Sequence, residues 1–263
     1  MRVQLRDFAM EYDERGSGVP LIFIHGYPLN RKMWQPQLSA LSDIARVITP
    51  DLRGHGGSDA VPGMNTMDDM AKDIKELIEN LDIKEPVILG GLSMGGYISF
   101  AFYRNYPELV KGMILAATRA TADNIDTKVN REEAAAIAQE RGTEAIIEMQ
   151  LPKMLAPSTL KTRPEIVELA RDIMLETPVQ AIVGDLRGML NRQDSIPTLK
   201  TIDCPVLILH GAEDQLIPLD EINLMQEAIR NARSKTILEA GHLLNLEQPE
   251  MFNLAVREFI SSV

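Results

Sequence analysis

The chain has 263 residues, of which 45% are hydrophobic and 25% are charged, the ordinary balance of a soluble globular protein. This length is near the upper limit for one hydrophobic core, so we expect one large domain or one domain with a sizeable insertion. The formal net charge of −11, without a Lys/Arg cluster, argues against a nucleic-acid partner or an anionic membrane surface. The first residues show no apolar signal segment, and no stretch approaches the roughly 20 apolar residues of a membrane span. We therefore expect a cytoplasmic protein.

Strand patterns begin at residues 3–18, which predict two short strands before a Gly-rich turn and hence an antiparallel edge. Short apolar runs then predict strands at residues 21–26, 45–51, 86–91, 110–118, 204–211 and 235–241. Because their hydrophobicity is continuous rather than alternating, these strands should be covered on both faces, as in a parallel sheet. Residues 67–81 have apolar side chains at helical spacing and predict a crossover helix. The fold class is therefore α/β, with a mostly parallel sheet of about eight strands flanked by helices.

The alternation stops between about residue 120 and about residue 200, where no strand-like run occurs. This segment instead shows several helical patterns separated by prolines: Pro152, Pro157, Pro164 and Pro178. We predict a helical cap at residues 120–200, inserted into a core domain that comprises residues 1–119 and 201–263. The cap should lie over the carboxyl ends of the strands, where ligands bind in open α/β sheets.

A candidate nucleophile follows the strand at residues 86–91. The segment from Gly91 to Gly95 matches G-x-S-x-G, which requires a very tight strand-to-helix turn without colliding side chains beside the serine. We expect Ser93 to attack an acyl carbon, with the backbone N–H of Met94 as one oxyanion donor. The second donor should come from the loop after the strand at 21–26, where the N–H of Tyr27 is the candidate. The alternative is a Gly-rich turn that only joins a strand to a helix.

The base and the acid are chosen by their place in the chain. Where the nucleophile lies in a G-x-S-x-G turn, the acid and then the histidine follow it along the chain. His242 fits this order, because it comes after Ser93, in a loop that follows the last predicted strand. The other histidines are predicted to form structural hydrogen bonds: His25, His55 and His210. The acid should follow the strand at 204–211, where Asp214 is preferred because its shorter side chain gives a better fixed hydrogen bond to the imidazole. Glu213 is the alternative acid.

No metal or organic cofactor is expected, because the sequence contains neither H-E-x-x-H nor a cysteine pair. The single cysteine, Cys204, excludes an internal disulfide and precedes an apolar run. We therefore expect a small buried residue at a strand start rather than a nucleophile, which would need an activating neighbour in an exposed setting.

Five motifs occur in order on both sides of the predicted insertion: HGYP, DLRGHGGSD, GLSMGG, GAEDQLIP and AGHLLNLEQPE. With them the chain resembles the α/β-hydrolase superfamily, and within it the small bacterial carboxylesterases and the 3-oxoadipate enol-lactonases. The resemblance implies the α/β-hydrolase fold, a triad of Ser93, Asp214 and His242, an oxyanion hole at Tyr27 and Met94, and a helical cap. Haloalkane dehalogenases of this fold carry an aspartate nucleophile, so halide displacement is not expected. Cofactor-independent haloperoxidases share the triad, which leaves perhydrolysis as a side activity.

Three functions remain open from the sequence. The leading one is a serine carboxylesterase for small esters, with apolar cap residues that either line an acyl pocket or simply pack the cap: Met149, Met154, Leu155, Met174, Met189 and Leu190. The second is an enol-lactonase, in which Arg119 binds the carboxylate of the lactone unless it is a surface or salt-bridged arginine. The third is a ligand-binding protein on a hydrolase scaffold. A small-molecule ester or lactone is the expected partner, and a homodimer is left open.

Overall fold

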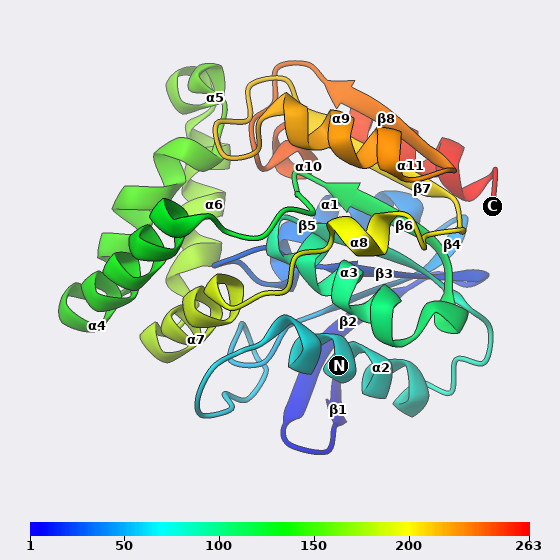
Figure 1. Ribbon diagram of the computed structural model, residues 1–263, viewed down its shortest axis with the longest axis horizontal. Coiled ribbons are helices and arrows are strands. Elements are labelled where there is room, and N and C mark those ends of the chain that lie inside the picture. Colours follow the sequence, from blue (N-terminus) through cyan, green and yellow to red (C-terminus); the bar gives the residue numbers. More distant parts are fainter.

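An eight-stranded, mostly parallel sheet forms the centre of the computed structural model, which describes residues 1–263 (Figure 1). Along the sheet the strands follow the order β1-β2-β4-β3-β5-β6-β7-β8. Pairing is antiparallel between β1 and β2 and between β2 and β4, and parallel between all other neighbours. The strands are β1 (Arg2–Gln4), β2 (Ala9–Arg15), β3 (Val19–Ile24), β4 (Ala45–Pro50), β5 (Val87–Leu92), β6 (Val110–Ala116), β7 (Val206–Gly211) and β8 (Ala232–Ile237). The predicted α/β-hydrolase fold and its antiparallel edge are confirmed.

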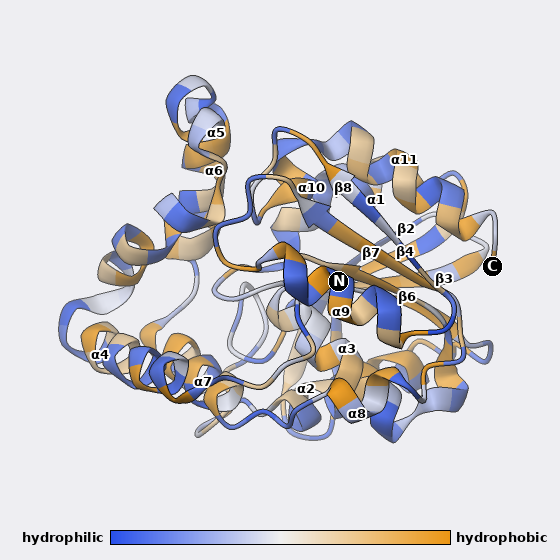
Figure 2. Ribbon diagram, turned by 45° about the horizontal axis from the view of Figure 1, so that its top comes forward, coloured by the Kyte–Doolittle hydropathy of each residue, from blue (hydrophilic) through white to orange (hydrophobic).

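Helices cover both faces of the sheet and bury two apolar cores. Consecutive side chains of β3 point to opposite cores, so that Ile22 and Ile24 pack on one side and Leu21 and Phe23 on the other. This double burial explains the continuous apolar runs of the interior strands, which Figure 2 shows in hydrophobic colours. One face carries α2 (Met67–Asn80), α3 (Met94–Asn105) and α9 (Leu219–Ala228), and the other carries α1 (Gln35–Leu41), α10 (Leu244–Glu247) and α11 (Pro249–Ile260).

Between β6 and β7 the chain forms only helices. They are α4 (Ile125–Met154), α5 (Pro157–Thr162), α6 (Pro164–Leu175), α7 (Val179–Leu190) and α8 (Ile196–Leu199), and α4 to α7 project beyond the sheet (Figure 1). Three prolines mark helix starts, because Pro157 and Pro164 open α5 and α6 and Pro178 precedes α7. Pro152 instead lies in the last turn of α4, so its predicted role as a separator was wrong. The division into a cap and a core domain stays a prediction.

The last strand, β8, differs from its predicted place. The apolar run predicted a strand at 235–241, whereas β8 spans Ala232–Ile237. It lies at the edge of the sheet and pairs only with β7, so polar residues occupy most of it and its hydrophobicity does not mark its extent. Beyond it, Leu238 is 72% exposed and Glu239 has a positive φ of 53°, which ends the extended segment.

None of the helices combines the length and the apolar composition that crossing a bilayer requires.

Short 3₁₀ turns complete the helical elements. They are η1 (Arg31–Trp34), which leads into α1, and η2 (Pro107–Leu109), which leads from α3 into β6.

The order in which strands are added to the sheet changes side at β3, because β4 lies on one side of β3 and β5 lies on the other. The loops that follow β3 and β5 therefore flank a topological switch point, the place where open α/β sheets bind ligands.

Candidate active site

Ser93 stands alone between the last residue of β5 and the first residue of α3. Its backbone has φ 55° and ψ −112°, a conformation that few non-glycine residues adopt. A Cβ atom on Gly91 would lie 2.2 Å from the carbonyl oxygen of Gly95, and one on Gly95 would lie 2.3 Å from that of Ile24. Only glycine fits at both positions, which gives the physical reason for the G-x-S-x-G spacing.

Asp214 and His242 meet in a buried hydrogen bond from two separate loops. Asp214 follows β7, and its Oδ2 lies 2.9 Å from Nδ1 of His242. The side chains are 0% and 2% exposed, respectively. The other carboxylate oxygen, Oδ1, accepts the N–H groups of Leu216 at 2.8 Å and Ile217 at 3.1 Å. Both oxygens are thus held, and the hydrogen bond at Nδ1 leaves Nε2 of His242 for another partner.

The charge of Asp214 is favoured by these contacts. Burial alone would raise the pKa of the Asp214 carboxyl, but the His242 imidazole and the two backbone amides together lower that pKa below its ordinary value. A carboxylate that is ionised and fixed in this way can orient the imidazole and stabilise its cation.

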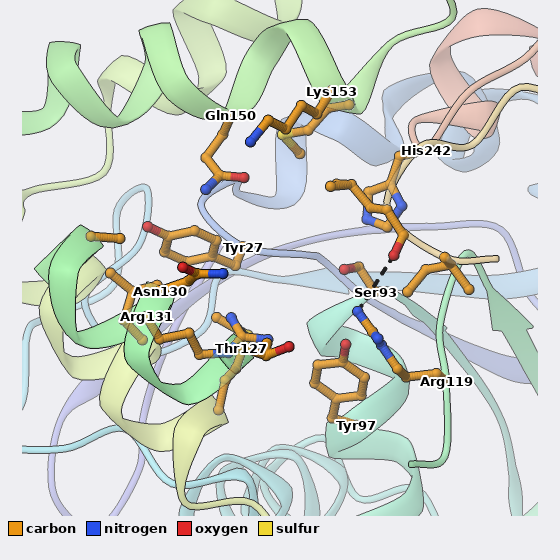
Figure 3. A pocket seen from close by; sticks show the side chains of 16 residues that line it. Tyr27, Ser93, Tyr97, Arg119, Thr127, Asn130, Arg131, Gln150, Lys153 and His242 are labelled. Carbon is orange, nitrogen blue, oxygen red and sulfur yellow. Dashed lines mark hydrogen bonds between the residues drawn. The ribbon is translucent and has the colours of Figure 1, made fainter. Parts of the chain in front are cut away.

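Ser93 and His242 line one cavity of about 230 Å³ (Figure 3). Sixteen residues form its wall, and they come from the strand ends on one side and from α4 and α7 on the other. Near the strand ends lie Tyr27, Ser93, Tyr97, Arg119, Leu216, Ile217 and His242, whereas the helices supply Thr127, Asn130, Arg131, Ala134, Gln150, Lys153, Met154, Leu186 and Met189. The helices inserted between β6 and β7 therefore close the cavity over the serine.

Two backbone amides beside Ser93 are free of protein acceptors. Met94 is the first residue of α3, so its N–H has no partner within the helix. The N–H of Tyr27, in the loop after β3, donates to no protein acceptor either. A Cβ atom on Gly26 would lie 3.4 Å from Cβ of Ser93, which shows how closely this loop approaches the serine. These are the two amides predicted as oxyanion donors, and both remain available to a ligand.

Cations dominate the charged groups of the cavity wall, which contains Arg119, Arg131 and Lys153 but no carboxylate. Arg131 pairs with Asp123, which also binds Arg192 at 2.6 Å, so the two arginines share one carboxylate. Arg119 forms no salt bridge; its guanidinium donates to the carbonyl oxygen of Leu216 at 3.4 Å (Figure 3), and its Nε is buried without a partner.

Lys153 is exposed and forms no salt bridge. The wall of the cavity therefore holds two cations, Arg119 and Lys153, that lack a carboxylate partner.

Both alternatives for the apolar cap residues, lining an acyl pocket and packing the cap, occur in the structure. Of the six apolar cap residues named from the sequence, only Met154 and Met189 line the cavity. Met149, Leu155 and Met174 instead pack with the two apolar cores, so the packing alternative holds for them.

Polar residues of α4 were missed in the sequence. Thr127, Asn130 and Arg131 fall at helical spacing along one face of this helix, and all three line the cavity. That spacing is the signal that would have found them.

Residues predicted to be structural behave accordingly. Nε2 of His25 accepts the N–H of Leu52 at 3.0 Å, and Nε2 of His210 lies 3.0 Å from the carbonyl oxygen of Ile217. Nε2 of His55 lies 2.9 Å from Asp185 on α7. Cys204 is buried next to β7, and burial raises the pKa of its thiol to about 12, so the thiolate needed for nucleophilic attack is disfavoured.

Residues 19–249 match the family described as having the alpha/beta hydrolase fold, and the chain belongs to this family. Among solved structures, it is similar to a thermophilic esterase from Thermogutta terrifontis with malate bound, at 37% identity and a TM-score of 0.97, covering 100% of this chain and 98% of the other.

Relatives known by sequence carry other activities in their names. 3-Oxoadipate enol-lactonase 2 of Acinetobacter baylyi is 29% identical over 95% of this chain and 92% of its own. A non-heme chloroperoxidase of Streptomyces lividans is 29% identical over 93% of this chain and 92% of its own. The family thus includes similar proteins named for ester, lactone and halide chemistry.

Proposed function

We propose that the protein is a serine hydrolase that cleaves small carboxylic esters through an acyl-enzyme on Ser93. In this proposal His242 is the general base and Asp214 the acid that orients it. The observation that carries it is the 2.9 Å hydrogen bond between His242 and Asp214, on an imidazole that lines the same cavity as Ser93. The similar esterase of Thermogutta terrifontis, which covers the whole chain, supports an ester as the substrate.

The chemistry follows from these positions. Nε2 of His242 takes the hydroxyl proton of Ser93 while Oγ attacks the ester carbon, and the imidazolium then gives that proton to the departing alkoxide. The N–H groups of Tyr27 and Met94 bind the oxyanion of the tetrahedral intermediate. Water, activated by the same imidazole, releases the acid and restores Ser93. Hydrogen peroxide in place of water would give a peracid, which is the perhydrolase side activity.

Replacing the serine tests this proposal. We expect Ser93→Ala to lower the turnover of p-nitrophenyl acetate by a factor of about 10³ or more, because nucleophilic attack is lost. Labelling by a fluorophosphonate should disappear in the same variant. Ser99→Ala is the matched control, since Ser99 is a buried serine on α3 whose hydroxyl donates to the carbonyl oxygen of Gly95 and lies outside the cavity. Equal turnover in Ser93→Ala and the native chain would reject catalysis by Ser93, and an unlabelled native serine would favour a ligand-binding protein.

A second candidate is the hydrolysis of a lactone that carries a carboxylate, of the 3-oxoadipate enol-lactone type. The charge of the cavity favours it, because a wall without carboxylates contains the unpaired cations Arg119 and Lys153 in a chain of net charge −11. The guanidinium of Arg119 lines the cavity without a salt bridge, so an anionic ligand would supply the charged acceptor that it lacks. The relatives named enol-lactonases, and the malate in the similar esterase, support a substrate with a carboxylate.

Substrate charge decides between the two candidates. We expect Arg119→Ala to lower kcat/KM for a carboxylate-bearing lactone or ester by about 10- to 100-fold, the value of a lost charged hydrogen bond, and to leave a neutral ester nearly unchanged. Arg104→Ala is the control, because Arg104 lies on α3 outside the cavity wall. An unchanged preference between charged and neutral substrates in Arg119→Ala would exclude the role of Arg119.

A further inference from the structure

A buried carboxylate, Glu247, connects the loop that carries His242 to the helices above it. Glu247 is the last residue of α10 and is 0% exposed. Its Oε1 accepts the N–H of Gly241 at 2.8 Å, and its Oε2 accepts the N–H of Ala156 at 2.8 Å. Gly241 directly precedes His242, and Ala156 lies in the short connection between α4 and α5. One side chain thus fixes the backbone of the loop that carries His242 and the backbone of the connection between α4 and α5.

Other contacts at the same place leave little freedom. The N–H of Leu243, directly after His242, donates to the carbonyl oxygen of Met154 at 3.0 Å, and Met154 lines the cavity. A Cβ atom on Gly241 would lie 2.6 Å from the backbone nitrogen of Ala156. The residues on either side of His242 are therefore both attached to the end of α4.

The charge of Glu247 is unusual for its surroundings. No lysine or arginine forms a salt bridge with this buried carboxylate. Burial raises the pKa of the Glu247 carboxyl, although the amides of Ala156 and Gly241 and the side chain of Thr159 oppose that shift. A buried carboxylate without a cation is costly. An ionised carboxylate is nevertheless the side-chain group that offers two acceptor oxygens and no donor, which is what two converging N–H groups require.

We infer that Glu247 is a positioning residue for His242. Through the N–H of Gly241 it holds the imidazole in line with Ser93, and through the N–H of Ala156 it keeps the end of α4 beside the same loop. This inference rests on the proposed serine hydrolase function. Asp214 orients the imidazole ring from the side of β7, whereas Glu247 fixes the backbone that carries the ring. Catalytic geometry tolerates little displacement, since a shift of about 1 Å costs roughly 100-fold in rate.

The variant Glu247→Gln tests the inference, because it keeps the shape and one acceptor but turns an amide donor toward the second N–H. We expect kcat for p-nitrophenyl acetate to fall by about 10- to 100-fold with KM nearly unchanged. The downfield proton resonance of His242 Nδ1–H should shift or broaden. Asp73→Asn is the control for lost stability, since Asp73 is a buried carboxylate on α2 that pairs with Arg53 outside the cavity wall. It should lower the free energy of unfolding but preserve kcat below the unfolding transition.

A native kcat and an unchanged His242 resonance in folded Glu247→Gln would overturn the inference and leave Glu247 a purely structural residue. If this variant does not fold, Glu247→Asp replaces it, because aspartate keeps the charge but is one methylene too short to reach both amides. The same loss of kcat is expected. Failure of the proposed function has a different signature, since Ser93→Ala would then retain turnover while the His242 resonance still responds to Glu247→Gln.

Discussion

Single residues with uncommon backbone conformations shape the cavity from both sides. Ser93 has a positive φ at the strand end, and Gly142 has φ 82° and ψ −177° within α4. Nothing lies within 4 Å of the place where a Cβ atom on Gly142 would stand, so packing does not demand glycine there. The conformation does, because this region of φ and ψ is essentially restricted to glycine. The resulting kink lets both halves of α4 contribute side chains to one cavity.

We therefore expect Gly142→Ala to lower the free energy of unfolding by about 1–3 kcal/mol through backbone strain alone. It should also lower kcat/KM for esters, because the two halves of α4 would realign around the cavity. Urea unfolding and steady-state kinetics measure the two effects. Gly63→Ala is the matched control, with φ 107° and no neighbour within 4 Å but a position outside the cavity wall. A native kcat/KM in Gly142→Ala would contradict the role of the kink.

At the scale of elements, the sequence predicts best what is buried on two faces. The interior strand β5 spans Val87–Leu92 against a prediction of 86–91, because apolar side chains on both faces leave a continuous run. The edge strand β8 was misplaced by three residues at its start, since an edge strand with a polar face carries no such run. The spacing of the motifs also brought Asp214 and His242 together correctly, although their catalytic roles stay predictions.

The inserted helices were predictable as helices but not as a cavity wall. The polar stripe of α4 that includes Thr127 and Asn130 has the same spacing as a stripe facing solvent, and only the placement of α4 over the strand ends distinguishes the two. The sequence did not predict a role for Glu247 for a similar reason. A glutamate among polar residues indicates an exposed site, whereas its two amide donors come from Gly241 and from Ala156, which lies 91 positions away in the chain.

At the scale of the whole molecule, a buried ion pair attaches the inserted helices to the sheet. His55 lies in the loop after β4 and Asp185 lies on α7, with 2.9 Å between Nε2 and Oδ2 and both side chains 0% exposed. Asp185 also accepts the side-chain amide of Asn65 at 2.8 Å. Burial alone would lower the pKa of His55, but the Asp185 carboxylate raises that pKa above its ordinary value. Protonated His55 is thus stabilised in the folded state.

The stability of this attachment should depend on pH. Because the folded pKa of His55 lies above its unfolded value of about 6.5, the pair contributes fully below about pH 6.5 and less as pH rises through the folded pKa. We expect Asp185→Asn to lower the free energy of unfolding by about 3–5 kcal/mol near pH 6 and by clearly less near pH 9, measured by urea unfolding. Asp123→Asn is the control, because Asp123 binds two arginines, Arg131 and Arg192, rather than a histidine, and its cost should stay constant. An equal cost of Asp185→Asn at both pH values would show that His55 is not charged in the folded protein.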